Sequence, residues 1–213
     1  GRPTILSWNG SMFEYLMPAL LMREPDGSLL QRIAGSAVRA QQIFGEQMGV
    51  PWGVSECAFF EQDNQLAFQY GPFGVPQLAL RRTPQEDQVV APYASVLALM
   101  VDLPAALVNL RELERQGARD RLGFIESLDF SASRLDGRGE RRRVFTYMAH
   151  HQGMSLLSLC NLLRKGAPQG WFERSPKAQA ARSLTHECLP REIVYQGGTI
   201  PRPLHKPGAE HLS

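Results

Sequence analysis

The 213-residue sequence has few cysteines and no excess of charge of either sign. Its three cysteines are far apart and include no CxxC pair, which excludes a disulfide framework and is typical of a reducing compartment. Lys and Arg total 23 against 21 Asp and Glu, so the net charge is only +2. A nucleic-acid-binding domain is usually strongly basic, so we expect no nucleic-acid partner.

Long apolar runs and familiar cofactor motifs are also missing. The longest apolar stretch, Val96–Val101, is followed by Asp102 and falls far short of the roughly 20 residues that cross a bilayer. We therefore expect a water-soluble chain without a membrane span. The GxxxxGK[ST], GxGxxG, GxSxG and HExxH patterns are absent, and the sequence shows no cluster of metal ligands. The sequence therefore predicts no metal ion and no organic cofactor.

What the sequence does contain is helical periodicity. Apolar residues from Leu29 to Phe44 recur at three- and four-residue spacing, between a possible N-cap at Ser28 and a stop at Gly49. Similar patterns elsewhere end at glycine or proline. The predicted helices are 11–23, 28–47, 92–101, 105–116, 145–163 and 177–188.

Strand signals are weak by comparison. Only Ala67–Tyr70 and Arg191–Tyr195 could form short extended pieces, and neither belongs to a long alternating pattern. About six helices joined by long loops predict an all-α fold. The Gly- and Pro-rich residues 197–213 are typical of a linker.

Several long loops interleave aromatic residues, glycines and carboxylates. Ordinary connections have a median of only ~4–6 residues, so loops of this length and composition indicate the lining of a cleft. A carboxylate among apolar or aromatic neighbours can hold a proton near neutral pH, and cleavage of a glycosidic bond needs two carboxyl groups. Each could instead cap a helix or pair with a buried arginine. The acidic candidates are Glu14, Glu56, Glu126 and Asp129.

A histidine pair, His150-His151, is followed by Gln152 inside a predicted helix. Neighbouring side chains on a helix point about 100° apart, so we do not expect both imidazoles to bind one metal ion. One could contact a sugar hydroxyl or a catalytic carboxylate while the other packs. A structural role is the stronger interpretation for such a pair alone.

Six motifs in order resemble the central glucoamylase-like region of the cyclic β-1,2-glucan synthases, over roughly residues 5–193. The first is Leu-Ser-Trp-Asn-Gly-Ser-Met-Phe-Glu-Tyr-Leu-Met-Pro at 6–18. The others are Val-Pro-Trp-Gly-Val-Ser-Glu at 50–56, Tyr-Gly-Pro-Phe-Gly-Val-Pro at 70–76, Val-Ala-Pro-Tyr-Ala at 90–94, Gly-Phe-Ile-Glu-Ser-Leu-Asp-Phe at 123–130 and Met-Ala-His-His-Gln-Gly-Met-Ser at 148–155.

The resemblance implies an (α/α)6 barrel of twelve helices that cuts linear β-1,2-glucan and rejoins its ends by retaining transglycosylation. Six helices are half of such a barrel, so we expect residues 1–196 to be the C-terminal part of that domain, which could associate with itself or with the missing half. The resemblance also implies a larger inner-membrane polypeptide, with this region on the cytoplasmic face beside a glycosyltransferase and a phosphorylase-like region.

For the chemistry we expect at least one catalytic carboxylate among Glu14, Glu56 and Glu126. Glu56 is the first choice for the acid/base and Glu126 the second. Substrate contacts are expected from Trp52, Tyr70, Phe73, Asp129, His150, His151 and Gln152. Two alternatives stay open: a β-1,2-glucan hydrolase on the same scaffold, and a non-catalytic module that binds glucan or serves as a scaffold.

Overall fold

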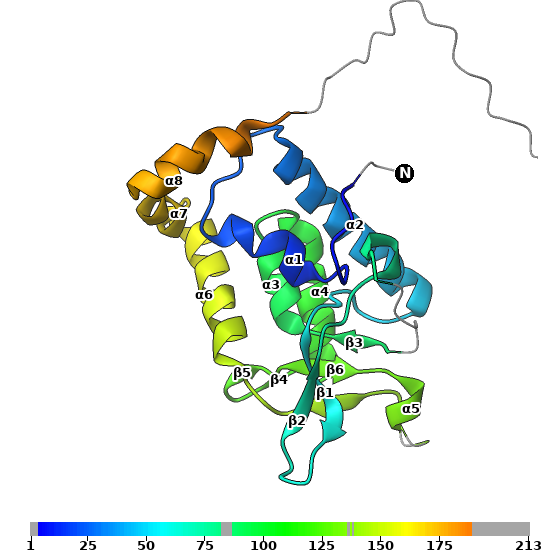
Figure 1. The fold of residues 1–213 in the computed structure, drawn as a ribbon. Coiled ribbons are helices and arrows are strands. Elements are labelled where there is room, and N and C mark those ends of the chain that lie inside the picture. Colours follow the sequence, from blue (N-terminus) through cyan, green and yellow to red (C-terminus); the bar gives the residue numbers. More distant parts are fainter. Residues whose placement is uncertain (1–3, 82–86, 136, 138, 189–213) are drawn as a thin grey trace, which may run out of the picture.

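The computed structural model describes residues 4–81, 87–135, 137 and 139–188. Its longer helices lie alongside one another, and its strands gather at one end (Figure 1). The predicted strand at Arg191–Tyr195 and the linker at 197–213 fall outside the described residues. Among the described helices, none has the length and apolarity needed to cross a bilayer.

The longest helix, α2 (Leu29–Met48), confirms the strongest prediction from periodicity. The Ser28 hydroxyl caps its start by accepting from the Gln31 amide, and Gly49 ends it in the left-handed conformation, with φ of +67°. Its buried stripe includes Ile33, Ala37 and Phe44. These residues recur on one face because four residues make slightly more than one helical turn.

Shorter helices complete this layer, and several of them are shorter than predicted. Pro18 breaks the first predicted helix into α1 (Met12–Leu16) and a 3-10 turn, η1 (Pro18–Leu20). The next helices are α3 (Pro92–Ala98), α4 (Leu103–Arg115) and the single turn α5 (Ala132–Leu135). After these come α6 (Ala149–Leu163), α7 (Ala167–Phe172), α8 (Pro176–Ala181) and η3 (Arg182–His186).

The prediction of an all-α fold misses a small β layer. Strands β1 (Cys57–Gln62) and β2 (Phe68–Gly71) form an antiparallel hairpin, which includes the extended piece predicted at 67–70. A second sheet orders β3 (Val89–Val90), β6 (Ser127–Asp129) and β7 (Arg142–Val144), all antiparallel. A third pairs β4 (Arg119–Asp120) with β5 (Gly123–Phe124). Strands of two or three residues are too short for alternation to reveal.

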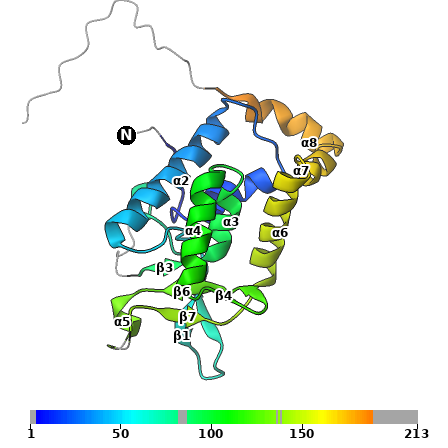
Figure 2. The ribbon, with the colours of Figure 1, turned by 180° about the vertical axis from the view of Figure 1, so that it is seen from behind.

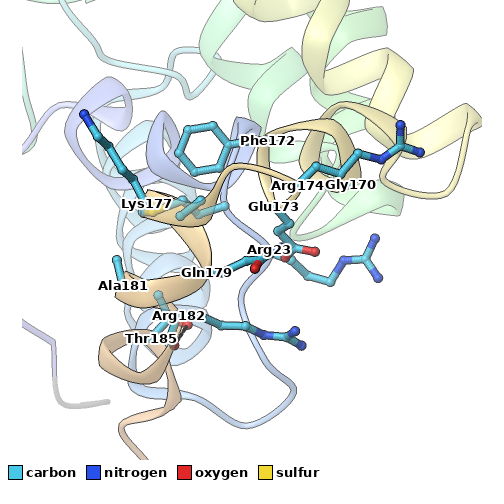
Figure 3. Close-up of a pocket in the computed structure, with 12 residues that line it drawn as sticks. Arg23, Gly170, Phe172, Glu173, Arg174, Lys177, Gln179, Ala181, Arg182 and Thr185 are labelled. Carbon is cyan, nitrogen blue, oxygen red and sulfur yellow. Dashed lines mark hydrogen bonds between the residues drawn. The ribbon is translucent and has the colours of Figure 1, made fainter.

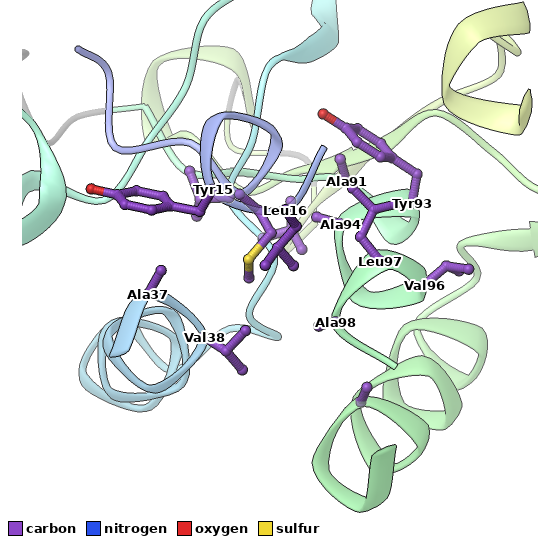
Figure 4. Close-up of a cluster of buried hydrophobic side chains, with 14 of the residues drawn as sticks. Tyr15, Leu16, Ala37, Val38, Ala91, Tyr93, Ala94, Val96, Leu97 and Ala98 are labelled. Carbon is purple, nitrogen blue, oxygen red and sulfur yellow. The ribbon is translucent and has the colours of Figure 1, made fainter. Parts of the chain in front are cut away.

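The apolar core lies where α1, α2 and α3 meet. Leu16 of α1, Val38 of α2 and Leu97 of α3 are each at most 1% exposed, and they point into the same space (Figure 4). Side chains so fully buried each contribute roughly 1.5–3 kcal/mol relative to exposure. The core therefore fixes α3, which carries Tyr93 toward the strands.

Two motif loops depend on glycine because their backbones touch. The Val75 amide donates to the Gly10 carbonyl at 2.9 Å. A Cβ atom at Gly74 would lie 1.8 Å from the Asn9 carbonyl oxygen, and Gly10 has φ of +74°. A larger residue at either glycine would push the loops apart. The loop at 7–11 is thereby locked against the turn η2 (Pro76–Leu78).

At the opposite end from the strands, α7 and α8 enclose a cavity of about 440 Å³ with Met22 and Arg23 (Figure 3). Its cationic lining residues are Arg23, Arg174, Lys177 and Arg182, with Glu173 between them. None of the residues expected to act on a substrate lines this cavity, so the functional site is sought elsewhere.

An apolar face runs along α4 and α6, which lie near each other in the rear view (Figure 2). Leu107 is 43% exposed and Leu156 is 68% exposed, and both line an apolar groove of about 320 Å³. Such a groove on a water-exposed surface favours association. This observation supports the predicted self-association of the chain.

We predict that the chain forms dimers or larger species through this face. The double substitution Leu107→Gln and Leu156→Gln should shift it to monomer in sedimentation velocity while leaving the thermal unfolding midpoint nearly unchanged, because both side chains are exposed. Leu184→Gln, at a leucine that is 79% exposed outside this face, is the matched control. A wild-type chain that sediments as a monomer at all concentrations would contradict the prediction.

Candidate active site

Glu56 stands at the end of an extended segment that is fixed by buried polar side chains. The Gln41 side chain of α2 accepts from the Val54 amide at 2.8 Å and donates to the Val54 carbonyl at 2.7 Å. Ser55 Oγ accepts from the Phe13 amide at 3.0 Å and lies 2.8 Å from the Tyr93 hydroxyl. The segment therefore cannot shift along its axis, and Glu56 is held half-buried at the start of β1.

Four side chains, Glu56, Tyr70, His150 and His151, meet at one point and are called the polar cluster below. The Tyr70 hydroxyl of β2 donates to Glu56 Oε1 at 2.9 Å. The Tyr70 hydroxyl oxygen also lies 3.4 Å from His150 Nε2 and 3.3 Å from His151 Nε2. Burial and the adjacent Glu56 carboxylate raise the pKa of Tyr70, so its hydroxyl keeps its proton and remains a donor.

The two histidines differ in environment although they are adjacent in the first turn of α6. His151 is buried, its ring stacks on Tyr93 at 3.7 Å between centroids, and its Nδ1 lies 2.8 Å from Glu126 Oε1. His150 is exposed. Partial burial and then the neighbouring His151 lower the pKa of His150. Tyr93 thus fixes one imidazole and leaves the other facing solvent.

The expectation that the two imidazoles point apart is wrong. Their ring centroids are 4.0 Å apart, and both Nε2 atoms face the Tyr70 hydroxyl. The 100° rotation per residue separates the Cα–Cβ bonds, but side-chain torsions bring the ring ends back together. Within the described residues, Glu56, His150 and His151 could hold a metal ion, since their ligand atoms all lie within 4.8 Å of one another.

The other carboxylates predicted from the sequence are occupied. Glu126, 2% exposed, accepts from His151 Nδ1 and from the Ala58 amide at 3.3 Å. Asp129 is fully buried, accepts from the Phe60 amide and pairs with Arg134 Nε at 2.6 Å. These contacts are those of positioning and structural residues, so the structure gives Asp129 no free oxygen toward a substrate.

Glu14 lies in a capping box. Its carboxylate accepts from the Ser11 amide at 3.0 Å, while the Ser11 hydroxyl accepts from the Glu14 amide at 3.2 Å. Further bonds come from Asn9 and Ser7. Burial alone raises the pKa of Glu14, but these hydrogen bonds outweigh it, and the pKa is lowered from 4.5. The structure does not bring Glu14 into the polar cluster.

Three expected substrate contacts also lie outside the polar cluster. Trp52 is partly buried, and its backbone is bonded on both sides by Asn109 of α4. Phe73 packs edge-to-face on Phe59 at 5.4 Å. Gln152 lines the apolar groove. Of the seven predicted contact residues, the polar cluster unites Tyr70, His150 and His151 with Glu56.

Two residues that support the site, Tyr93 and Arg134, were not among the candidates predicted from the sequence. Tyr93 stacks on His151, and its hydroxyl donates to the Glu56 carbonyl at 2.9 Å. Arg134 neutralises Asp129 and Asp87. Tyr93 was present in the Val-Ala-Pro-Tyr-Ala motif and could have been nominated from it. Arg134 sits outside every motif, and only the fold reveals its partners.

Several solved structures have the same fold as this chain. The chain shares its fold with a putative glucoamylase from Bacteroides caccae ATCC 43185 (TM-score 0.57, 18% identity, 84% of this chain and 42% of that one). Similar matches are endo-β-1,2-glucanases from Chitinophaga pinensis (TM-score 0.58, 14% identity, 84% and 41%) and Talaromyces funiculosus (0.59, 20%, 83% and 34%). The fold is therefore that of glucoamylase-like domains.

The chain belongs to the putative glucoamylase family, whose model matches residues 1–176. It is also 42% identical over 192 residues to the cyclic β-(1,2)-glucan synthase NdvB of Rhizobium meliloti (strain 1021). That match covers 90% of this chain and 7% of NdvB. The resemblance to the glucoamylase-like region of the cyclic β-1,2-glucan synthases is confirmed, whereas the closed barrel and the place of this chain within it stay predictions.

We predict that Arg134→Met lowers the free energy of unfolding by about 3–5 kcal/mol, because it leaves the fully buried Asp129 without its cation. Urea denaturation measures the change. Arg119→Met removes a pair with Glu114 in which both side chains are about half exposed, and should cost about 0–1 kcal/mol. Similar costs for the two variants would show that the Asp129 pair is not the stronger one.

We predict that Glu14→Gln lowers stability at pH 7 by about 1 kcal/mol, because the neutral amide keeps one acceptor of the capping box but loses the charge that the Ser7, Asn9 and Ser11 hydrogen bonds stabilise. Because folding lowers the pKa of Glu14, its contribution is present above the unfolded value near 4.5 and disappears as the pH falls through the lower folded value. Chemical denaturation at pH 7 and pH 3 tests this. The exposed Glu46→Gln is the control, and a loss that persists undiminished at the lower pH would contradict the prediction.

Proposed function

We propose that this chain is the carboxylate-bearing part of a glucoamylase-like domain that acts on β-1,2-glucan. The polar cluster supports this proposal, because it places a half-buried carboxylate and an exposed histidine at the surface beside donors that can hold a sugar. NdvB and the two glucanases, which are named for β-1,2-glucan, support the substrate class.

In the proposed chemistry Glu56 is the acid/base. It protonates the departing glycosidic oxygen and then deprotonates the sugar hydroxyl that attacks in place of water. The Tyr70 hydroxyl orients Glu56 by donating to Oε1. Glu126 acts as a positioning residue, because it touches the site only through His151. His150 is the best placed of the two histidines to contact the glucan, since it faces solvent.

A retaining reaction also needs a nucleophile, and its carboxyl group lies ~5–5.5 Å from the acid/base. Asp129 has both oxygens engaged in buried hydrogen bonds. Glu126 is 2% exposed, and its Oε1 is shared by His151 and the Ala58 amide, while Glu14 caps α1. We therefore propose that the nucleophile comes from another part of a longer polypeptide of the NdvB type. The likeness to NdvB supports the rest of such a polypeptide as the proposed partner of this chain. The resemblance to the cyclic β-1,2-glucan synthases gives the cytoplasmic face of the inner membrane as its proposed location.

Hydrolysis is the second candidate, because two of the structural relatives are endo-β-1,2-glucanases. Hydrolysis and cyclisation share the acid/base and differ in the acceptor. A site that excludes water favours the sugar hydroxyl. Products distinguish the two, since a cyclic glucan is lighter by one water than the linear chain of equal length.

We predict that the longer polypeptide containing these residues converts linear β-1,2-glucan to cyclic products, detected by mass spectrometry. Glu56→Gln should lower kcat about 10²–10⁴-fold, the usual contribution of general acid–base catalysis, while binding of the glucan persists. Glu61→Gln, at an exposed carboxylate of the adjoining strand β1, should leave the rate unchanged.

Three other outcomes would change the proposal in different ways. Linear fragments alone would replace cyclisation by hydrolysis. Full activity of Glu56→Gln would remove Glu56 from the chemistry. Glucan binding without turnover by the complete polypeptide would favour a non-catalytic binding module.

A further inference from the structure

We infer that Glu56, His150 and His151 form a binding site for a divalent transition-metal ion of the Zn²⁺ class. Their three ligand atoms already lie within 4.8 Å of one another. Two imidazoles and one carboxylate are a common ligand set of zinc sites that keep one position open. The inference concerns metal binding by the chain itself and does not depend on the proposed action on glucan. An ion bound to Glu56 would occupy the carboxylate of the proposed acid/base, so metal binding and that step would exclude each other.

The hydrogen-bond partners of His151 fix which of its nitrogens faces the site. Glu126 Oε1 accepts from the Ala58 amide, which can only donate, so this oxygen serves as an acceptor for His151 Nδ1 as well. In the neutral imidazole the proton then resides on Nδ1, and Nε2 presents a lone pair. Metal-binding histidines commonly make this hydrogen bond to a carboxylate through their second nitrogen.

Tyr93 and Glu126 also hold that lone pair in place. The stacked rings of Tyr93 and His151 are inclined by only 12°, and His151 is fully buried. An imidazole fixed on both sides loses little freedom when it binds an ion. The second ligand, His150, is exposed, so an ion can reach the site from solvent.

A neutral His151 that is protonated on Nδ1 has a lone pair on Nε2, and the neighbour of this lone pair is the Tyr70 hydroxyl. The Tyr70 hydroxyl carries one hydrogen, and its shortest contact, 2.9 Å, is to the Glu56 carboxylate. The Nε2 atom of His151 lies 3.3 Å from the Tyr70 hydroxyl oxygen. Because the hydroxyl hydrogen points to Glu56, it is not available to this nitrogen. A bound cation would satisfy the lone pair of His151 and the charge of Glu56 together.

The Tyr70 hydroxyl occupies the space between the three ligands, so its displacement is part of the inference. A zinc ion needs nitrogen and oxygen ligands at about 2.0–2.2 Å, which is shorter than any of the Tyr70 contacts. Tyr70 is 42% exposed near the end of a two-stranded hairpin, and it can turn toward solvent. The imidazoles favour zinc, copper or nickel over Mg²⁺ and Ca²⁺, which prefer oxygen ligands.

Titration of the 213-residue chain with ZnCl₂, followed by calorimetry without carbohydrate, tests the inference. We expect one saturable site per chain, which Co²⁺ also fills with a visible absorption band typical of a four- or five-coordinate ion. Glu56→Gln and His150→Ala should each weaken binding at least about tenfold. Both residues are at least partly exposed, so the variants should fold, and circular dichroism verifies this.

Control variants distinguish this site from other side chains of the chain that could bind Zn²⁺. The variant with His186→Ala and Cys188→Ser removes an exposed histidine and thiol far along the chain, and it should bind Zn²⁺ as the wild type does. Tyr70→Phe should bind at least as tightly, since the displaced hydroxyl is gone. Three results would each overturn the inference. They are a lack of saturable binding by the wild type, binding by Glu56→Gln or His150→Ala as tight as that of the wild type, and loss of binding in the His186 and Cys188 control.

Discussion

The buried polar clamp on residues 52–55 is the constraint on which the rest of the structure depends. An extended segment inside a protein leaves backbone donors and acceptors without water, and each unpaired group costs about 1–3 kcal/mol. Gln41 satisfies both groups of Val54, and Asn109 satisfies those of Trp52. Because these side chains come from α2 and α4, the two helices and the segment hold one another in register. The position of Glu56 follows from that register, because Glu56 comes directly after the clamped segment.

A second layer of buried charge fixes the strands beneath the polar cluster. Glu126 and Asp129 accept from the amides of Ala58 and Phe60, which alternate along β1, and so they tie β1 to β6. Each carboxylate has a different partner on its other side: His151 for Glu126 and Arg134 for Asp129. A buried charge without such partners would be far too costly. The same contacts that anchor the hairpin therefore also orient His151 toward Tyr70.

The sequence was informative where a local rule decides the structure. Periodicity predicts α2 because twenty residues sample five turns of one face, and Ser28 and Gly49 mark its ends. The β layer escaped prediction because strands such as β6, with three residues, form only when distant segments pair. The polar cluster was only partly predictable. All four of its members were candidates, but so were carboxylates that the fold uses in a helix cap or a buried pair. Aromatic and apolar neighbours in the sequence do not distinguish a desolvated acid from a satisfied structural one. Glu126 finds its partners His151 and Ala58 far along the chain, and nothing in the local pattern showed that Asp129 would pair with Arg134, five residues away.

The burial of Glu126 and Asp129 limits the chemistry that this surface can perform alone. Double displacement at a sugar requires two free carboxyl groups on opposite faces of the ring, and in the polar cluster only Glu56 is half-exposed and bonded to a movable hydroxyl. The chain matches about two fifths of the length of the putative glucoamylase and the bacterial glucanase, and its apolar groove lies against α6, the helix that carries the histidines. A segment that packed into that groove would contact the helix behind His150 and His151. If such a segment came from the rest of a longer polypeptide, the same association would cover the apolar face and complete the proposed active site.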